Sequence, residues 1–166
     1  MPQQNNGNQS ALNRLENELE TAQQNEDRTL QADALTRMSG EYKNLDKTDH
    51  ALEYARRALE LYQSMKNYKG QGKVLNDLGS IYQLKQDDEQ AYQYYIQSMQ
   101  AREQVKDISG MAETRFNLAV LSLTQKKIRE AVMGLLESQF VFLTLGKKTG
   151  ISQSSRPVVG NQQSAG

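Results

Sequence analysis

The sequence predicts an all-α fold, an α-solenoid of antiparallel helix pairs, and three observations support it. Alanine recurs at steps of 40 residues, and glycine keeps the same step later in the chain. No segment alternates apolar and polar residues for long enough to indicate a strand. A fixed period of this length is typical of a solenoid, in which each unit buries its apolar face against its neighbours. The residues that keep the period are Ala11, Ala51, Ala91 and Ala131, then Gly70, Gly110 and Gly150, then Tyr42 and Tyr82.

The N-terminal end supplies half of a repeat. Residues 1–9 are rich in Gln and Asn and have no periodic apolar positions, so we expect a disordered tail there. From about Ser10 to Gln24, leucines share one helical face, which predicts the first helix. Its alanine keeps the register of the later ones, and the helix is therefore the second of an incomplete leading unit. The leucines are Leu12, Leu15 and Leu19.

Three full helix pairs follow, and short polar links between the helices favour antiparallel packing within each pair. The first pair ends near Lys66, the second near Val105, and the last helix spans residues 128–145. Within the second pair, Asp87 and Gln90 predict a capping pair at a helix start. The apolar positions are Leu30, Ala34, Leu35, Met38, Leu52, Ala55, Leu59 and Tyr62 in the first pair, Val74, Leu75, Leu78, Ile81 and Tyr82 in the second, and Ala112, Phe116, Leu118, Ala119 and Leu121 in the third.

Glycines and a change of composition mark the boundaries. We expect Gly70 and Gly110 to form the turns between pairs, because glycine tolerates a positive φ at a helix end. The repeat domain then covers residues 10–149. From Lys147 onward the chain is rich in Gly, Ser and Gln and loses the apolar pattern. Residues 150–166 are assigned as a flexible tail, the alternative being that a longer array is cut there.

Composition argues against several function classes. Twenty basic residues balance twenty acidic ones, so no overall field favours nucleic acid or a membrane surface. The chain has no cysteine, which fits a reducing compartment, and we expect a cytoplasmic protein without membrane insertion. His50 is the only histidine and is placed in a polar loop before a helix, so we expect neither a histidine-based catalytic triad nor a multi-histidine metal site. We predict no enzyme activity, no metal and no cofactor.

One segment carries a recognisable motif. Leu78-Gly79-x-x-Tyr82, followed by Ala91 and Ser98, resembles the signature of the tetratricopeptide repeat family. The other two units match it less fully, with Ser39 and Ala119 at the position of the small residue. The 40-residue period looks like the longer-helix variety of this repeat. The resemblance implies a right-handed solenoid that binds other proteins.

The resemblance also implies a binding surface, a concave groove lined by the first helix of each pair. Members of the family bind an extended peptide or a helix there, through polar groups and apolar pockets. The basic and asparagine cluster with which some members bind a C-terminal carboxylate is absent. The alternative interpretation is that these positions are the solvated faces of amphipathic helices. The groove residues so assigned are Arg37, Lys43, Lys73, Asn76, Asp77, Ser80, Gln83, Phe116, Asn117, Val120 and Leu123.

The last helix is apolar around most of its circumference, which predicts that it is covered on more than one side. Natural solenoids end in a polar cap, and this helix is not one. Our hypothesis is that it self-associates or docks a partner. The alternatives are that residues 150–166 fold back over it, or that the chain is truncated. The assigned anchors are Leu136, Phe140, Phe142 and Leu143.

Two functions remain from the sequence. The first is a non-catalytic scaffold or adaptor that binds a protein or peptide partner and forms a homo-oligomer. The second is a peptide-sensing regulatory domain of a larger signalling protein, which requires an output domain that these residues do not contain.

Overall fold

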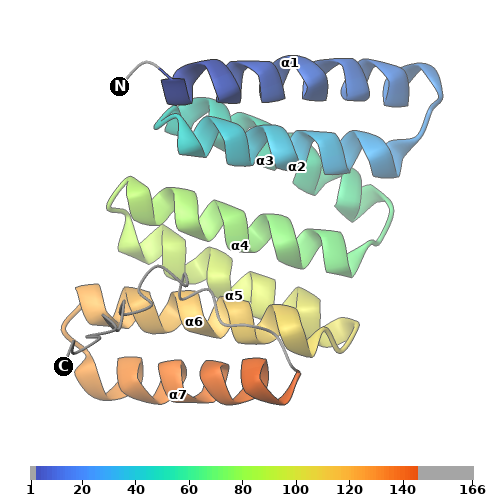
Figure 1. Ribbon diagram of the computed structural model, residues 1–166. Coiled ribbons are helices and arrows are strands. Elements are labelled where there is room, and N and C mark those ends of the chain that lie inside the picture. The colour runs from blue at the N-terminus through green and yellow to red at the C-terminus, as the bar shows by residue number, and fades with distance from the viewer. Residues whose placement is uncertain (1–2, 146–166) are drawn as a thin grey trace, which may run out of the picture.

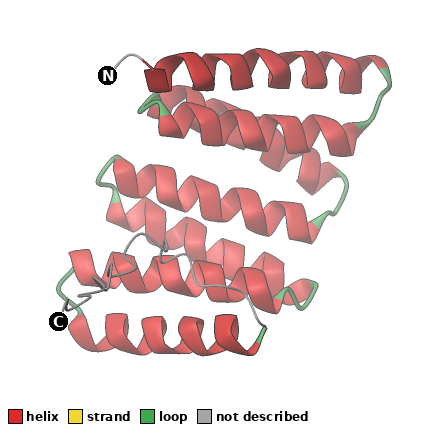
Figure 2. Cartoon of the chain, viewed as in Figure 1, coloured by secondary structure: helices red, strands yellow, loops and turns green. Residues whose placement is uncertain are grey.

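The computed structural model describes residues 3–145 and is helical over almost all of this range, with no strand within it. Figure 1 shows the helices stacked as successive antiparallel pairs, and Figure 2 shows that only short loops join them. Met1, Pro2 and residues 146–166, which include the predicted flexible tail, lie outside the described residues. The helices are α1 (Gln3–Gln24), α2 (Arg28–Asn44), α3 (Thr48–Ser64), α4 (Tyr68–Leu84), α5 (Asp88–Gln104), α6 (Ile108–Thr124) and α7 (Ile128–Thr144).

The first helix begins earlier than expected. Helix α1 starts at Gln3, whereas the sequence pattern places its start near Ser10. The pattern follows apolar positions, and Gln and Asn can extend a helix into solvent without contributing any. Leu12 and Leu15 are buried against the rest of the chain, as the leucine face predicts.

One helix-ending turn is used six times. Each of α2 to α7 has 17 residues, and three residues separate successive helices. In every turn the last residue donates its backbone N–H to a carbonyl five residues earlier, as Asn67 does to Tyr62 at 2.9 Å. This is the Schellman pattern, which needs a left-handed residue. Those residues are Glu26, Asp46, Lys66, Gln86, Lys106 and Lys126, and none is glycine.

The prediction that Gly70 and Gly110 form these turns is therefore wrong. Both lie in the first turn of a helix, where their N–H groups donate to the capping side chains of Asn67 and Asp107. A Cβ at Gly70 would overlap the ring of Tyr62. Glycine is needed there because two helices approach closely, not because of its φ freedom. The predicted cap at Asp87 is confirmed, since its carboxylate accepts the N–H of Gln90 at 3.1 Å.

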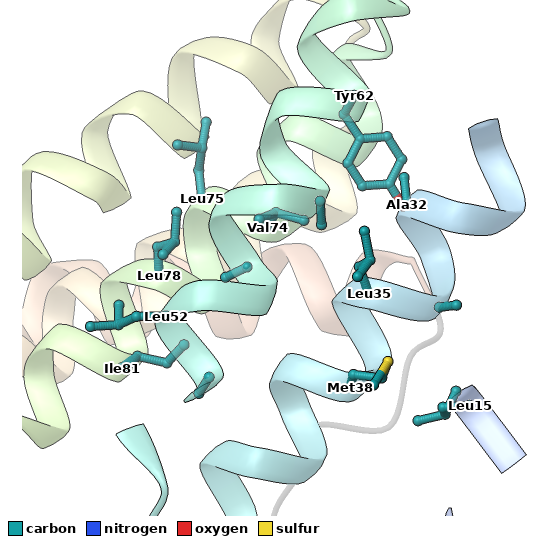
Figure 3. Close-up of a cluster of buried hydrophobic side chains, with 14 of the residues drawn as sticks. Leu15, Ala32, Leu35, Met38, Leu52, Tyr62, Val74, Leu75, Leu78 and Ile81 are labelled. Carbon is teal, nitrogen blue, oxygen red and sulfur yellow. The ribbon is translucent and has the colours of Figure 1, made fainter. Parts of the chain in front are cut away.

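Small residues allow the two helices of each pair to approach closely. The Ser39 hydroxyl of α2 donates to the carbonyl of Ala51 in α3 at 2.8 Å. Ala91 and Ala131, which keep the same register, are fully buried. Around these contacts a core of aliphatic side chains and Tyr62 joins α1 to α4 (Figure 3). Leu30, which the sequence places in the core, is instead 55% exposed, because it lies in the first turn of α2 near the groove.

The array has an inner and an outer layer. Helix α2 contacts α4, and α4 contacts α6, whereas the described helices α3, α5 and α7 make no contact with one another. The closer spacing of α2, α4 and α6 puts them on the concave side. This arrangement agrees with the expected place of a groove.

Two glycines provide a matched test of this packing. At Gly79 an added Cβ would lie 2.6 Å from the ring of the buried Tyr95, whereas nothing lies within 4 Å of one at Gly40. We expect Gly79→Ala to lower the free energy of unfolding by at least about 1 kcal/mol through overpacking. Gly40→Ala should raise it by up to about 1 kcal/mol through helix propensity. Urea denaturation followed by circular dichroism measures both, and equal effects would contradict the close approach.

Candidate functional site

A polar cleft lies on the concave side of the array. It has a volume of about 480 Å³ and runs across the N-terminal turns of α2, α4 and α6. Two smaller hollows of about 410 and 360 Å³ continue along the boundary between α1 and α2. Together they extend along the inner layer, which is the shape that an elongated ligand requires.

Charges alternate across the cleft because of the repeat. Asp33, Lys73 and Glu113 hold the same position in α2, α4 and α6 and all line the cleft. The two carboxylates are already engaged from within the protein. Asp33 accepts a hydrogen bond from the Tyr62 hydroxyl, and Glu113 accepts one from Arg102 at 3.1 Å. The exposed ammonium of Lys73 is therefore the group best placed to meet a ligand.

Arg102 is the site residue that sequence reasoning missed. Its side chain reaches the cleft from α5 and is 2% exposed, and its Nε has no hydrogen-bond partner among the described residues. Added Cβ atoms at Gly72 and Gly110 would overlap it, so both glycines make room for the guanidinium. The register offers a signal, since Arg102 falls where the other pairs carry Tyr62 and Phe142. A charged residue at an otherwise aromatic position indicates a special role.

Asp77 lies on the floor of the same cleft, one helical turn from Lys73. Burial raises the pKa of its carboxyl to about 6, although the positive charges of Lys43 and Lys73 act to lower it. Glu113 adds to the increase. Nearby, Lys43 donates to the Ser80 hydroxyl at 3.1 Å, and Ser80 donates to the backbone carbonyl of Asp77 at 2.8 Å. The structure thus brings these four predicted groove residues, Lys43, Lys73, Asp77 and Ser80, together.

Three predicted groove residues, Asn76, Asn117 and Gln83, instead join helices to one another. Asn76 is 4% exposed and accepts a hydrogen bond at 3.0 Å from the amide of Asn117, which links α4 to α6. Gln83 accepts the hydroxyl proton of Tyr95 at 3.0 Å. All three amides are therefore used in packing, those of Asn76 and Asn117 between successive repeats and that of Gln83 within the α4–α5 pair.

The remaining groove residues differ along the array. On α6, Phe116 and Leu123 are exposed and Val120 is half-buried, so this end of the inner layer is apolar. At the other end, Arg37 of α2 pairs with Glu18 of α1. The groove therefore changes from charged to apolar between α2 and α6.

The predicted anchors of the last helix divide into two groups. Leu136, Phe140 and Leu143 are 62%, 68% and 71% exposed. Phe142 is half-buried and lies at the inward position that Tyr62 occupies in α3. The outward group alone is available to another molecule.

Other chemistry has little support in this part of the chain. His50 stacks on Tyr42, with ring centroids 5.1 Å apart. No group of acidic and histidine side chains within residues 3–145 is arranged to hold a metal ion. None of the described helices is long and apolar enough to span a bilayer.

Comparison with known families agrees with this architecture. Residues 32–68 and 72–105 match the family model of the tetratricopeptide repeat. These two segments are tetratricopeptide repeats. The matched segments cover α2 to α5 with their turns, and α6 and α7 continue the same 20-residue spacing of helices. Tetratricopeptide repeats in general serve as scaffolds for protein–protein interaction, and this general class of function applies here.

A solved structure supports the fold independently. The crystal structure of BtubC (BKLC) from P. vanneervenii is similar to this tetratricopeptide array, with a TM-score of 0.72 at 17% sequence identity. The similarity covers 95% of this chain and 65% of that one, so this chain spans less than two-thirds of its length. At this identity the likeness shows the fold alone. No curated protein sequence matches the chain.

The raised pKa of Asp77 has a measurable consequence for stability. An unfolded aspartate has a pKa of about 3.9, so the folded state holds the proton more tightly, and stability falls as the pH rises from about 4 to about 6. Above pH 6 the carboxyl of Asp77 is ionised in the folded state, and burial of this charge lowers the free energy of unfolding. We therefore expect Asp77→Asn to be more stable than the natural chain by about 1–3 kcal/mol at pH 7.5. Below pH 4 the difference should vanish. Urea denaturation at both pH values measures this, and a constant difference would contradict the assignment.

Proposed function

We propose that this protein is a non-catalytic scaffold that holds an extended or helical segment of a partner protein in its concave groove. The observation that carries this proposal is the polar cleft along α2, α4 and α6, where Lys73 is exposed between two engaged carboxylates. Packing of the core does not require an open cleft at this place. We also propose that the scaffold self-associates through the outward side chains of α7.

The groove chemistry favours a particular kind of segment. Lys73 would attract a carboxylate or a backbone carbonyl, and Arg102 adds positive charge beneath the cleft. Further along the inner layer, Phe116, Val120 and Leu123 would receive an apolar side chain. The best-fitting segment therefore has an acidic residue at the α4 end and an aliphatic or aromatic residue towards α6. The balanced net charge supports a protein partner rather than a nucleic acid, and the absence of cysteine supports a cytoplasmic location.

Charge reversal tests the groove directly. Peptides selected from a displayed random 16-residue library serve as the probe, and their affinity is measured by fluorescence anisotropy. We expect Lys73→Glu to weaken binding at least about tenfold, since an attraction becomes a repulsion. Arg57→Glu is the matched control, because Arg57 lies on the outer helix α3 and undergoes the same change of charge. Equal binding by the two variants, or peptides that do not compete with one another, would contradict a groove site.

A further inference from the structure

Helix α7 carries an apolar stripe with the spacing of a coiled coil. Met133, Leu136, Phe140 and Leu143 follow one another at steps of three, four and three residues. All four are more than half exposed, and we call them the α7 seam. Steps of three and four place side chains along one line of a helix, where they insert between the side chains of a facing helix. No charged residue interrupts this line.

Comparison with the other outer helices shows that the seam is not a face for another repeat. Helix α3 is followed by another repeat, and its residues at the four seam positions are polar. Those at the positions of Met133, Phe140 and Leu143 stay exposed although the next repeat is present. Among the four positions, that of Leu136 borders the following repeat. In α3 this position is held by Arg56, which donates a hydrogen bond to the hydroxyl of Tyr82 in α4. A further repeat would therefore leave most of the seam in water. The α3 residues are Glu53, Arg56, Glu60 and Gln63, and those in α5 are Gln93, Ile96, Gln100 and Glu103.

We propose that the α7 seam packs against the same seam of a second copy of this chain, antiparallel, about a twofold axis. This inference rests on the self-association proposed above and specifies its geometry. The axis passes between Leu136 and Phe140, so Leu136 faces Phe140 of the partner subunit. Met133 then faces Leu143 of the partner subunit.

The area and the shape of the molecule favour a second copy. A standard interface buries about 800 Å² on each partner, and the exposed parts of the seam with Ile128 and Val132 beside it are of that order. The exposed side of α1, at the other end of the array, is polar, because Asn13, Glu16 and Glu20 lie on it, and it does not match the apolar seam. A head-to-tail chain is therefore disfavoured, and a closed pair that hides both seams is favoured.

Charge decides between the two possible directions. Lys126, Lys127 and Arg129 cluster where α7 begins, and all three are exposed. In a parallel pair the two clusters would meet and repel one another. In an antiparallel pair each cluster lies beside the C-terminal end of the facing helix, whose free carbonyls carry partial negative charge. Lys147 and Lys148 follow that end in the sequence and oppose this attraction, so the antiparallel direction rests on the opposed helix dipoles.

Cross-linking tests the direction, since the natural chain contains no cysteine. In the antiparallel pair two copies of residue 133 lie roughly 15 Å apart along the helix, too far for a disulfide. We expect Met133→Cys mixed with Leu143→Cys to form a disulfide dimer under mild oxidation, and neither variant alone to do so. Cross-linking of Met133→Cys to itself without the mixed product would overturn the antiparallel arrangement and leave self-association standing.

Mass measurement by light scattering tests the surface. We expect the full chain to have twice the 18.8 kDa mass of one copy. Phe140→Asp should raise the dissociation constant at least about 100-fold by burying a charge in the seam. Gln100→Asp is the matched control, because it also introduces an aspartate, at the exposed position of α5 that is equivalent to Phe140.

The outcomes separate this inference from the proposed function. A dimer that Phe140→Asp leaves intact would overturn the seam but not self-association. A natural chain that is monomeric at the concentrations used would overturn both, while peptide binding in the groove stays a separate measurement. A particle larger than two copies would also overturn the closed twofold pair.

Discussion

A left-handed residue in each of the six turns between the described helices is the constraint on which this structure depends. Helices α2 to α7 each have 17 residues, and three residues separate successive helices. Because this spacing is constant, residues 40 apart meet equivalent surroundings from α2 to α7. The small residues of each pair therefore lie where its two helices cross. The hydrogen bond from Ser39 to the carbonyl of Ala51 shows how closely the two backbones approach. Without equal helix lengths, neither the inner layer nor the outer layer would be regular.

The regular inner layer explains the character of the groove. Repetition places Asp33, Lys73 and Glu113 in one line, and buried groups from the outer helices reach in to engage the carboxylates. Tyr62 does this for the first pair and Arg102 for the second. The cleft is thus partly neutralised from below, and recognition depends on the few groups that remain exposed. Asp77 is the exception, since burial in the floor raises the pKa of its carboxyl to about 6.

The two ends of the array are chemically different. The exposed side of α1 is polar, with Asn13, Glu16 and Glu20 on it. Helix α7 instead presents Leu136, Phe140 and Leu143 outward, at positions where the outer helices α3 and α5 carry polar side chains, apart from Ile96. The proposed groove runs along the array and the proposed association surface lies at one end, so mutations can test the two separately.

The sequence by itself determined the helical class, the 40-residue unit, the cap at Asp87 and the apolar character of the last helix. Each of these depends on residues within a few turns of one another, where helical periodicity and local hydrogen bonding decide the outcome. Only the tertiary structure decided that Asn76 and Gln83 are used in packing, that Gly70 makes room for a ring, and that Arg102 reaches the cleft. These contacts are made by side chains of other helices, such as Tyr62 at Gly70 and Asn117 at Asn76, and spacing along one helix carries no record of them.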